Sequence, residues 1–415
     1  MKFLASIQTY NQAIMITPEQ YASLERRIIA SVDDRAEELI AISRDIHAHP
    51  ELMWNEHYAV KTLTAALTAD GFEVEHNTGG LDTAFMARTH GTEPNGPMIG
   101  IIAEYDALPE IGHACGHNLI ATSALGAGFA LNSVMSELPG TVAVIGTPAE
   151  EGGGGKMIMR DKGVFKGVDA VMMTHMAMEN VTKPVFLAVG AVEIVMHGRA
   201  SHAAAAPEAG INALDAIIQT FNGINALRQH IRSDSRIHGV ITNGGAAANI
   251  VPELAVASFA CRALDAPYAD LLVKKLRLVA EGAALATGAT LEFKHRISVE
   301  HVQSNDVMAR LFGNRLKQFG RESAERQKDG PASTDMGPLS HHVPAIHPLV
   351  QIVDLPTAWH TPDFRDAAYS DRGQQGMLVA AKAMALTTLD LLVKPGLLDT
   401  VKAEFEAYIK ATKLV

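Results

Sequence analysis

Residues 98–118 read MIGIIAEYDALPEIGHACGHN, an apolar run that leads into a loop rich in reactive groups. The nearly continuous apolar segment 98–104 is typical of a strand that is buried in the centre of a parallel sheet. A second apolar segment, 141–147, leads in the same way into the sequence PAEEG at 148–152. Because ligands of open α/β sheets gather beyond the carboxyl ends of the strands, we expect both loops to contribute to one site.

Strands and helices alternate on either side of this stretch. The patterns predict strands at 72–75, 84–88 and 169–174, and helices at 59–69 and 118–138. Thr17, Pro18 and Gln20 form a capping-box start for helical sequence that continues, with interruptions, to His49. The alternation indicates an α/β domain with a mostly parallel mixed sheet flanked by helices.

The pattern changes between residues 187 and 303. Four longer strands are predicted at 192–196, 237–242, 254–261 and 290–295, and two helices at 212–229 and 268–286. This order is typical of a ferredoxin-like α+β module. The α/β pattern then resumes with a strand at 347–353 and a helix at 372–392. We therefore predict a catalytic domain formed by 1–186 and 304–415, with the module 187–303 inserted into it.

Composition limits the classes of protein to consider. The chain has 415 residues, of which 47% are hydrophobic, and its formal net charge of −11 argues against a nucleic-acid-binding protein. No stretch approaches the roughly 18–20 uninterrupted apolar residues of a membrane span, and polar residues interrupt the first 16 positions before a signal-length run develops. Only Cys115 and Cys261 are present, too few for a disulfide framework. We expect a cytoplasmic protein without nucleic-acid or membrane partners.

The groups beyond the predicted strands suit a metal centre. Thiolate, imidazole and carboxylate ligands suit Zn(II), Mn(II) or a similar ion. Two ions roughly 3.5–4 Å apart can share a water, lower its pKa and polarise a scissile carbonyl. Of the neighbours Glu150 and Glu151, one can bind metal while the other moves the proton of that water. Taken singly, Cys115 could be a buried apolar residue, His117 a helix-start histidine and the acid pair a solvated one.

Other catalytic motifs fail on inspection. The sequence GGGGK at 152–156 resembles a phosphate-binding loop, but Met157 replaces the required Ser or Thr. The chain contains neither a G-x-S-x-G elbow nor an H-E-x-x-H helix. Serine-hydrolase and zincin chemistry are therefore not expected.

The motifs together resemble the co-catalytic metallopeptidases that include aminoacylase, carboxypeptidase G and amidohydrolases acting on N-acyl amino acids. The resemblance covers nearly the whole chain. It rests on IHAHPEL at 46–52, DALP at 106–109, HACGH at 113–117, PAEEGG at 148–153, GRASHA at 198–203, GG at 244–245, NIVP at 249–252 and the late His360.

The resemblance implies a role for each matched residue. Five ligands would hold two divalent ions (Mn or Zn, with Co as a substitute), and Cys115 would bridge them. These ligands are Cys115, His117, Glu151, His175 and His360. Glu150 would be the general base and acid, and Asp106 would support the ligands without binding metal.

The inserted module would be a lid and dimerisation domain, so that a homodimer or larger homo-oligomer is expected. His202 on it would polarise the substrate carbonyl, in its own site or in the partner subunit's. Asn249 would contact substrate, and Arg262 would hold a carboxylate. The alternatives are a surface-loop histidine for His202 and a plain strand-face charge for Arg262.

Departures from the family pattern point to one branch. Asn118 replaces an Asp, residues 104–109 read EYDALP in place of DMDALP, and residues 333–337 read STDMG. These features resemble p-aminobenzoyl-glutamate hydrolases and β-alanyl-lysine-type dipeptidases, and they add Ser333 and Thr334 as candidates for binding substrate. A bulkier or unusual acyl or amine half is therefore favoured over a generic N-acetyl amino acid.

We predict a hydrolase that cleaves the amide C–N bond of a small substrate, either a dipeptide or an N-acyl or N-aroyl amino acid. A hydroxide between the two metals would be the nucleophile, and Glu150 would carry protons. One alternative is an aminohydrolase that releases ammonia from a non-peptide substrate such as an aryl amine. Another is a silent metal-binding scaffold, against which the presence of Glu150 beside a ligand argues.

Overall fold

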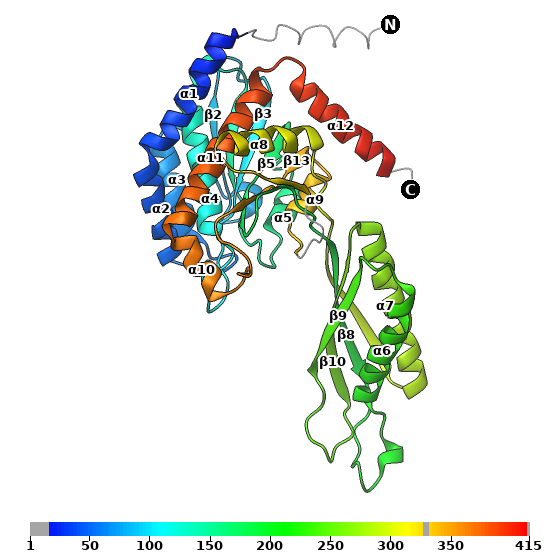
Figure 1. Cartoon of the computed structure of the whole chain (residues 1–415). Helices are drawn as coiled ribbons and strands as arrows, with labels where there is room; N and C mark the ends of the chain where they lie inside the picture. The colour runs from blue at the N-terminus through cyan, green and yellow to red at the C-terminus, as the bar shows by residue number, and fades with distance from the viewer. Residues whose placement is uncertain (1–15, 327–331, 413–415) are drawn as a thin grey trace. The chain divides into compact units, whose positions relative to one another are not determined.

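The computed structural model of the chain describes residues 16–326 and 332–412 (Figure 1). Residues 1–15, on which the expectation of no signal segment rests, lie outside the described residues. The first of two compact units runs to Pro184 and resumes at Gln303 and again at Pro338. The second is Val185–Val302 with the segment that ends at Gly337. The sequence analysis had assigned residues 187–303 to the inserted module and the segment before Pro338 to the catalytic domain.

The first unit is built on a six-stranded mixed sheet. Its order is β1 (Glu73–His76), β2 (Phe85–His90), β4 (Thr141–Gly146), β3 (Met98–Ala103), β5 (Ala170–Met172) and β13 (Ala345–Ile346). The pairings from β4 to β13 are parallel, and those of β1 and β2 are antiparallel. The expected α/β class is confirmed. Strands β3 and β4 are the two apolar runs of the sequence, and both end at the same edge of the sheet.

The first unit contains the following helices (Figure 1). They are α1 (Pro18–Asp34), α2 (Ala36–Ala48), α3 (His57–Ala69), α4 (His117–Asn132), α5 (Gly155–Asp161), α8 (Asp306–Gln318), α10 (Pro362–Tyr369), α11 (Asp371–Val393) and α12 (Leu397–Thr412), with the short α9 (Met336–Ser340) at the junction of the units. Thr17 and Gln20 make the reciprocal capping bonds at the start of α1, as predicted. Helix α4 is buried from His117 to Leu131, and ends earlier than predicted, before a separate 3-10 turn (Met135–Glu137).

Helix α11 is the only described helix long and apolar enough to cross a membrane by length and composition. Within its apolar window, 89% is buried inside the protein, as in a core helix. Its neighbours include α4, α1 and α8.

A second sheet in the first unit was missed by the sequence. Its order is β12 (Ala324–Arg326), β7 (Val181–Lys183), β14 (Leu349–Gln351) and β6 (His175–Ala177). The strands predicted at 169–174 and 347–353 are confirmed as β5 and β14, which are shorter than predicted and belong to different sheets. The chain passes from β5 to β6 and from β13 to β14, and β14 pairs in parallel with β6. His175 therefore opens a strand, where the sequence had placed it at the end of one.

The second unit has the predicted ferredoxin-like order of elements. These are β8 (Ala188–His197), α6 (Ala213–Leu227), β9 (Arg236–Asn243), β10 (Leu254–Ala263), α7 (Ala266–Thr287) and β11 (Thr290–Val299). All pairings in the sheet, of order β11-β8-β10-β9, are antiparallel. Both helices lie on one face (Figure 1), where Ile194, Ile217, Phe259 and Leu276 share an apolar core. Of three further 3-10 turns, Thr78–Gly80 belongs to the first unit. The other two, Pro207–Ala209 and Arg228–His230, belong to the second unit.

Candidate metal centre

The first unit brings five predicted ligands together from four parts of the chain. Cys115 and His117 stand at the start of α4, Glu151 follows β4, His175 opens β6, and His360 precedes α10. Donor atoms of Cys115, His117 and His175 lie within 4.8 Å of one another, and so do those of Cys115, Glu151 and His360. Cys115 belongs to both groups. This is the arrangement expected of a ligand shared by two ions.

The separations between donor atoms suit metal ligands. Cys115 Sγ lies 3.3 Å from His175 Nε2, and His360 Nε2 lies 3.5 Å from Glu151 Oε1. Metal–ligand bonds of ~2.0–2.3 Å in a tetrahedral site leave neighbouring donors roughly 3.3–3.7 Å apart. His117 Nε2 is 3.9 Å from the same Glu151 oxygen. The spacing of these donor atoms is therefore that expected around a bound ion.

Two buried atoms face this space without a hydrogen-bond partner among the described residues. They are His117 Nε2 and Glu151 Oε1. The other ring nitrogen of His117, Nδ1, is 2.8 Å from Asp106 O and 3.1 Å from Asp106 Oδ1. Similarly, His175 Nδ1 is 2.8 Å from Met176 O. Metal-binding histidines are commonly oriented in this way by a partner on the second nitrogen. The donor set fits Zn(II) or Mn(II).

Asp106 lies behind two of the ligands. Besides contacting His117, its Oδ2 accepts a hydrogen bond of 3.0 Å from the backbone N–H of Glu151. Burial alone would raise the pKa of Asp106, but the hydrogen bond and charge of His117 lower it below the ordinary value. The carboxylate thus links the loop after β3 to the loop after β4. Its position is that of a support for the ligands.

Burial and charge set the protonation of the centre. Burial lowers the pKa of His175 to about 4, so its ring is neutral and able to bind a cation. Burial would also lower the pKa of His117, but Asp106 and Cys115 raise it well above the usual range. Burial, with repulsion from Glu151, raises the pKa of the Cys115 thiol. A bound cation would favour the thiolate instead, because coordination deprotonates cysteine.

Glu150 lies beside the ligands. One of its carboxylate oxygens is within 4.8 Å of the donor atoms of His117 and Glu151. The turn that presents it needs glycine, because a Cβ on Gly155 would lie 1.9 Å from Pro148 O. A Cβ on Gly153 would meet the Trp54 ring at 2.6 Å. Close packing therefore explains the glycines at 153 and 155, and positive φ angles explain those at 152 and 154.

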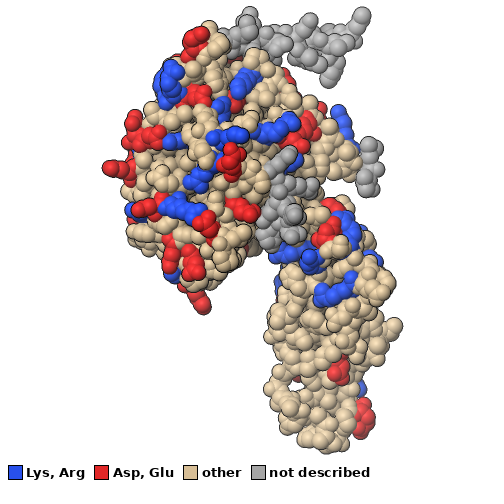
Figure 2. Space-filling view, in the orientation of Figure 1, with Lys and Arg blue, Asp and Glu red and all other residues tan. Residues whose placement is uncertain are grey.

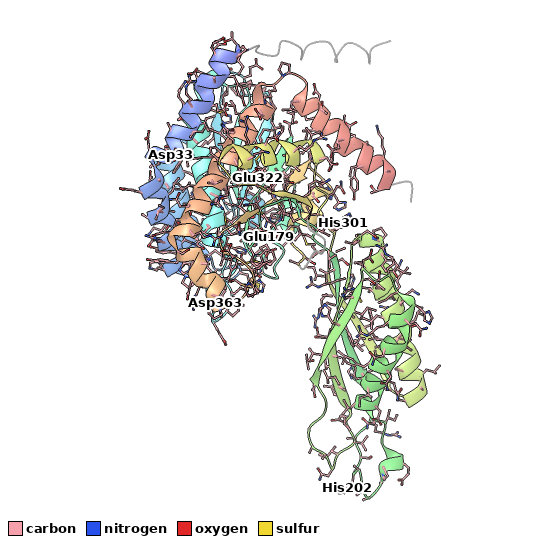
Figure 3. All side chains as sticks on the ribbon, viewed as in Figure 1. Asp33, Glu179, His202, His301, Glu322 and Asp363 are labelled. Carbon is pink, nitrogen blue, oxygen red and sulfur yellow. The ribbon has the colours of Figure 1, made fainter. Side chains whose placement is uncertain are left out.

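The predicted substrate-binding residues belong to the second unit. His202, labelled in Figure 3, is exposed, and its Nδ1 accepts hydrogen bonds from the backbone N–H groups of Ala204 and Ala205. Asn249 is also exposed. It lies near His202, because its backbone carbonyl accepts a hydrogen bond of 3.0 Å from Ala203 N. Both residues therefore lie on one group of loops.

Arg262, on β10, donates a hydrogen bond of 2.9 Å to Ser333 Oγ, and burial lowers its pKa. Thr334 is buried, and its hydroxyl accepts from Met336 N. Arg262 and Ser333 are thus brought together, while the Thr334 hydroxyl supports the turn that leads into α9.

Several buried ionisable residues around the centre escaped the sequence analysis. Lys156 and Glu104 form a fully buried ion pair, and Glu104 Oε2 is 3.8 Å from His117 Nε2. Lys156 had been considered only as part of a phosphate loop. His347 is buried with its ring 5.7 Å from that of His175, and Glu56 is buried against the turn before Glu150. No pattern in the sequence marks these three-dimensional contacts.

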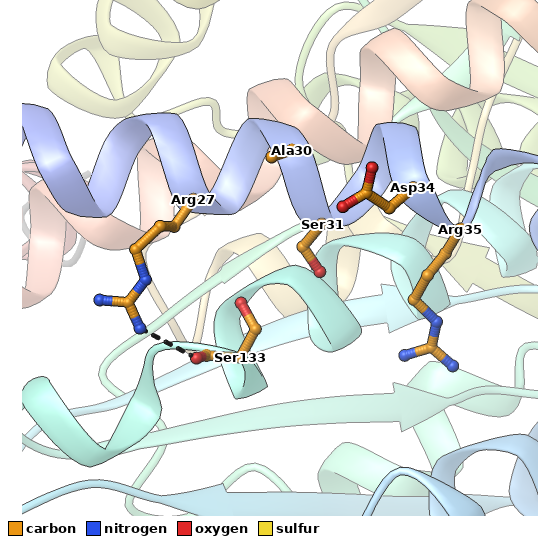
Figure 4. Close-up of a pocket in the computed structure, with 6 residues that line it drawn as sticks. All are labelled: Arg27, Ala30, Ser31, Asp34, Arg35 and Ser133. Atoms are coloured by element: carbon orange, nitrogen blue, oxygen red, sulfur yellow. Dashed lines mark hydrogen bonds between the residues drawn. The ribbon is translucent and has the colours of Figure 1, made fainter.

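A surface pocket lies elsewhere on the first unit, between α1 and Ser133 (Figure 4). Arg27 donates to Ser133 O at 3.3 Å and pairs with Glu137, and Arg35 pairs with Glu38 and Asp70. Since both guanidinium groups are already bound by acids, this pocket is not an anion site.

Comparison with known proteins agrees with this geometry. Residues 100–372 match the profile of peptidase family M20/M25/M40. The chain is 38% identical to a mouse (Mus musculus) Xaa-Arg dipeptidase, over 94% of each chain. It is 29% identical to one of the subunits of p-aminobenzoyl-glutamate hydrolase from Escherichia coli, over 88% of this chain and 91% of that one.

Solved structures share the fold. A putative aminohydrolase from methicillin-resistant Staphylococcus aureus superposes with a TM-score of 0.75 at 20% identity, covering 89% of this chain and all of that one. A dinuclear metal-binding peptidase of family M20 from Bacillus subtilis gives 0.70 at 24% identity, covering 87% and 99%. The family resemblance inferred from the motifs is confirmed. The protein is a metal-dependent amide hydrolase, and the chain belongs to peptidase family M20/M25/M40.

Proposed function

We propose that this chain hydrolyses the amide bond of a dipeptide or of an N-acyl or N-aroyl amino acid at a centre of two divalent cations. The observation that carries the proposal is the pair of buried atoms, His117 Nε2 and Glu151 Oε1, that face the other donors without hydrogen bonds. The five ligands would be Cys115, His117, Glu151, His175 and His360. Mn or Zn is the proposed native metal, and Co a substitute.

When bound, the two cations would supply an activated water and polarise the scissile carbonyl. Glu150, which lies beside the ligands, would take a proton from that water at its carboxylate and deliver it to the leaving amine. Asp106 would hold His117 and Glu151 in place through the bonds described above. The burial of His117 and Asp106 keeps bulk water away from the supporting bonds.

For the substrate, we propose dipeptides with a basic C-terminal residue as the first class to test. The support is the 38% identity to an Xaa-Arg dipeptidase over nearly the whole of both chains. Aroyl-glutamates are the second class, because of the p-aminobenzoyl-glutamate hydrolase relative.

We propose further that the second unit, residues 187–303 in the sequence assignment, is a lid and dimerisation domain. His202 and Asn249 would contact the substrate, with Arg262, Ser333 and Thr334 as further binding residues. The hydrogen bond from Arg262 to Ser333 supports a joint role for those two. A homodimer through this unit and a cytoplasmic location are part of the proposal, the latter supported by two free thiols.

The experiment is a comparison of wild type with Glu150→Gln, each reconstituted separately with Mn(II), Zn(II) and Co(II). We expect the variant to keep its metal content and to lose activity by about 10²–10⁴-fold. Substrates are basic dipeptides, aroyl-glutamates and N-acyl amino acids. Release of ammonia in place of an amino acid would favour the aminohydrolase alternative. Full activity in Glu150→Gln would overturn the role assigned to Glu150.

A further inference from the structure

Two residues with strained backbones flank the turn that carries the acid pair. Trp54 and Ala149 have φ angles of +69° and +59°, in the left-handed region that side chains with a Cβ rarely adopt. Ala149 immediately precedes Glu150. Strained residues of this kind persist only where their surroundings hold them, and they cluster at functional sites.

One buried carboxylate holds both residues. Glu56 Oε1 accepts hydrogen bonds from Trp54 N at 3.0 Å and from Ala149 N at 2.8 Å, and its Oε2 accepts from Thr83 Oγ1 at 2.7 Å. Glu56 is 0% exposed. Hydrogen bonds to a charged acceptor are stronger than those between neutral groups. The carboxylate therefore offsets the strain at two points at once.

The contacts of Glu56 extend to both halves of the metal centre. The carbonyl of Thr83 accepts a hydrogen bond of 2.5 Å from Tyr105 OH, and Tyr105 adjoins Asp106. On the other side, Ala149 O accepts from Gly153 N and Gly154 N at 3.0 and 2.8 Å. Both backbone groups of Ala149 are therefore fixed, and the direction in which the chain enters Glu150 is set.

We propose that Glu56 is a positioning residue for hydrolysis, which holds Ala149 in the left-handed conformation so that Glu150 points at the reacting groups. The proposal rests on the proton-transfer role proposed for Glu150. Without the bond to Glu56, Ala149 relaxes toward an ordinary φ and the Glu150 carboxylate swings away from its place. A displacement of about 1 Å costs on the order of a hundredfold in rate.

The test compares Glu56→Ala, Glu56→Asp and Glu56→Gln in steady-state kinetics and in metal content by elemental analysis. Alanine removes the acceptor, and aspartate is one methylene shorter. We expect both to lower kcat by about a hundredfold while KM and metal content stay close to wild type. Glutamine keeps an oxygen for Trp54 and Ala149, so we expect it to retain kcat within a few-fold.

Glu51→Ala is the matched control. The Glu51 carboxylate also accepts backbone hydrogen bonds, from Tyr58 N and Ala59 N at the start of α3, but it does not touch the turn at Ala149. We expect this variant to lose stability and keep kcat. A crystal structure of Glu56→Asp should show Ala149 at negative φ.

Wild-type kcat in Glu56→Asp, or a loss in Glu56→Gln equal to that in Glu56→Asp, overturns the proposal. If Glu56→Ala does not fold, Glu56→Asp and Glu56→Gln decide the question alone. Glu150→Gln is measured in the same assay. An inactive Glu150→Gln with a fully active Glu56→Asp refutes only the positioning role, whereas a fully active Glu150→Gln refutes the proposed proton transfer itself.

Discussion

The two units differ in the side chains that they bury and in those that they expose. The first unit buries ionisable side chains such as Glu56, Glu104, Asp106, His117 and Lys156. Among the described residues of the second unit, the buried polar residues are Thr220, Ser235, Thr334 and Asp335, of which only Asp335 is an acid or a base. Conversely, eight of the twelve large exposed hydrophobic residues in the described chain belong to the second unit. They are Ile218, Val240, Ile241, Ile250, Leu254, Leu271, Leu278 and Leu285.

Figure 2 shows the same contrast on one face of the molecule, where charges of both signs are interspersed on the first unit and the second is largely uncharged. Burying charge costs free energy, so a sequence retains buried charges where chemistry needs them. Exposed apolar surface is costly for solubility, so it is retained where a partner covers it. The contrast supports the proposed division into a reacting unit and an associating unit.

The largest expected effect comes from breaking the buried ion pair of the first unit. Lys156→Met removes the ammonium group from the buried Glu104 carboxylate, and should lower the free energy of unfolding by about 3–5 kcal/mol. Urea unfolding followed by tryptophan fluorescence measures this, because Trp54 and Trp359 both lie in the first unit. The double variant Lys156→Met with Glu104→Gln should recover part of the loss.

The control for this prediction is an exposed pair of the second unit. Glu193 pairs with Arg296 on the sheet surface. We expect Glu193→Ala to leave the urea midpoint, followed by circular dichroism, unchanged. Equal losses of stability in Lys156→Met and Glu193→Ala would contradict the contrast between the units.

Removing the cations should destabilise the first unit selectively. At a free metal concentration of 100 times Kd, metal binding adds about 2.7 kcal/mol to the free energy of unfolding. Chelation should remove this contribution from the unfolding transition followed by tryptophan fluorescence.

Cys115→Ser should show reduced metal content, because a hydroxyl is a far poorer bridging ligand than a thiolate. Unchanged metal content in that variant would contradict the bridging role.

Association should depend on the second unit. Val240, 60% exposed on the edge strand β9, is the residue to change, and Val240→Lys should weaken the proposed dimer by about tenfold or more in Kd, or ~1.4 kcal/mol. Leu355→Lys, at a position of the first unit that is 62% exposed, is the matched control. Sedimentation of both variants over a concentration series gives the result. A dimer weakened only by Leu355→Lys would reverse the assignment of the associating unit.

The smallest effect concerns the buried thiol of the second unit. Burial raises the pKa of Cys261 from 9.0 to about 12. Above pH 9 the unfolded chain releases this proton and the folded chain keeps it, so stability falls as pH rises toward 12. Between pH 8 and pH 10 the loss should be about 1 kcal/mol in urea unfolding followed by circular dichroism. Cys261→Ala should lack this part of the pH dependence; an identical slope in both proteins would contradict it.

Elements with a clear periodicity could be predicted from the sequence. Strand β10 and helix α7 are long enough for their apolar pattern to define them, and the capping box at Thr17 fixes the start of α1. The short strands β6 and β13 could not be found, because two or three residues show no periodicity and each lies next to a predicted strand in the sequence. The break between the two sheets is a tertiary effect.

The residues of the candidate site also divide into those that the sequence could predict and those that it could not. The ligands could be proposed because Cys, His and Glu in these motifs are chemically specific. Glu56 and the pair of Glu104 with Lys156 could not, because an acid or a lysine on its own is usually a surface residue. Their burial and their partners depend on segments distant in the sequence, such as Thr83 and Ala149 for Glu56.

Next to His175 the chain passes from one sheet to the other, and this has a consequence for how the protein folds. The imidazole stands at the first pairing of β6 with β14, and its backbone N–H binds Pro348 O at 2.9 Å. A slip of one residue in that pairing would move the ring by about 3.3 Å and turn it to the opposite face. A cation held by His175 would therefore stabilise only chains in which β6 and β14 pair in the native register, so metal binding would favour the correct assembly of the small sheet.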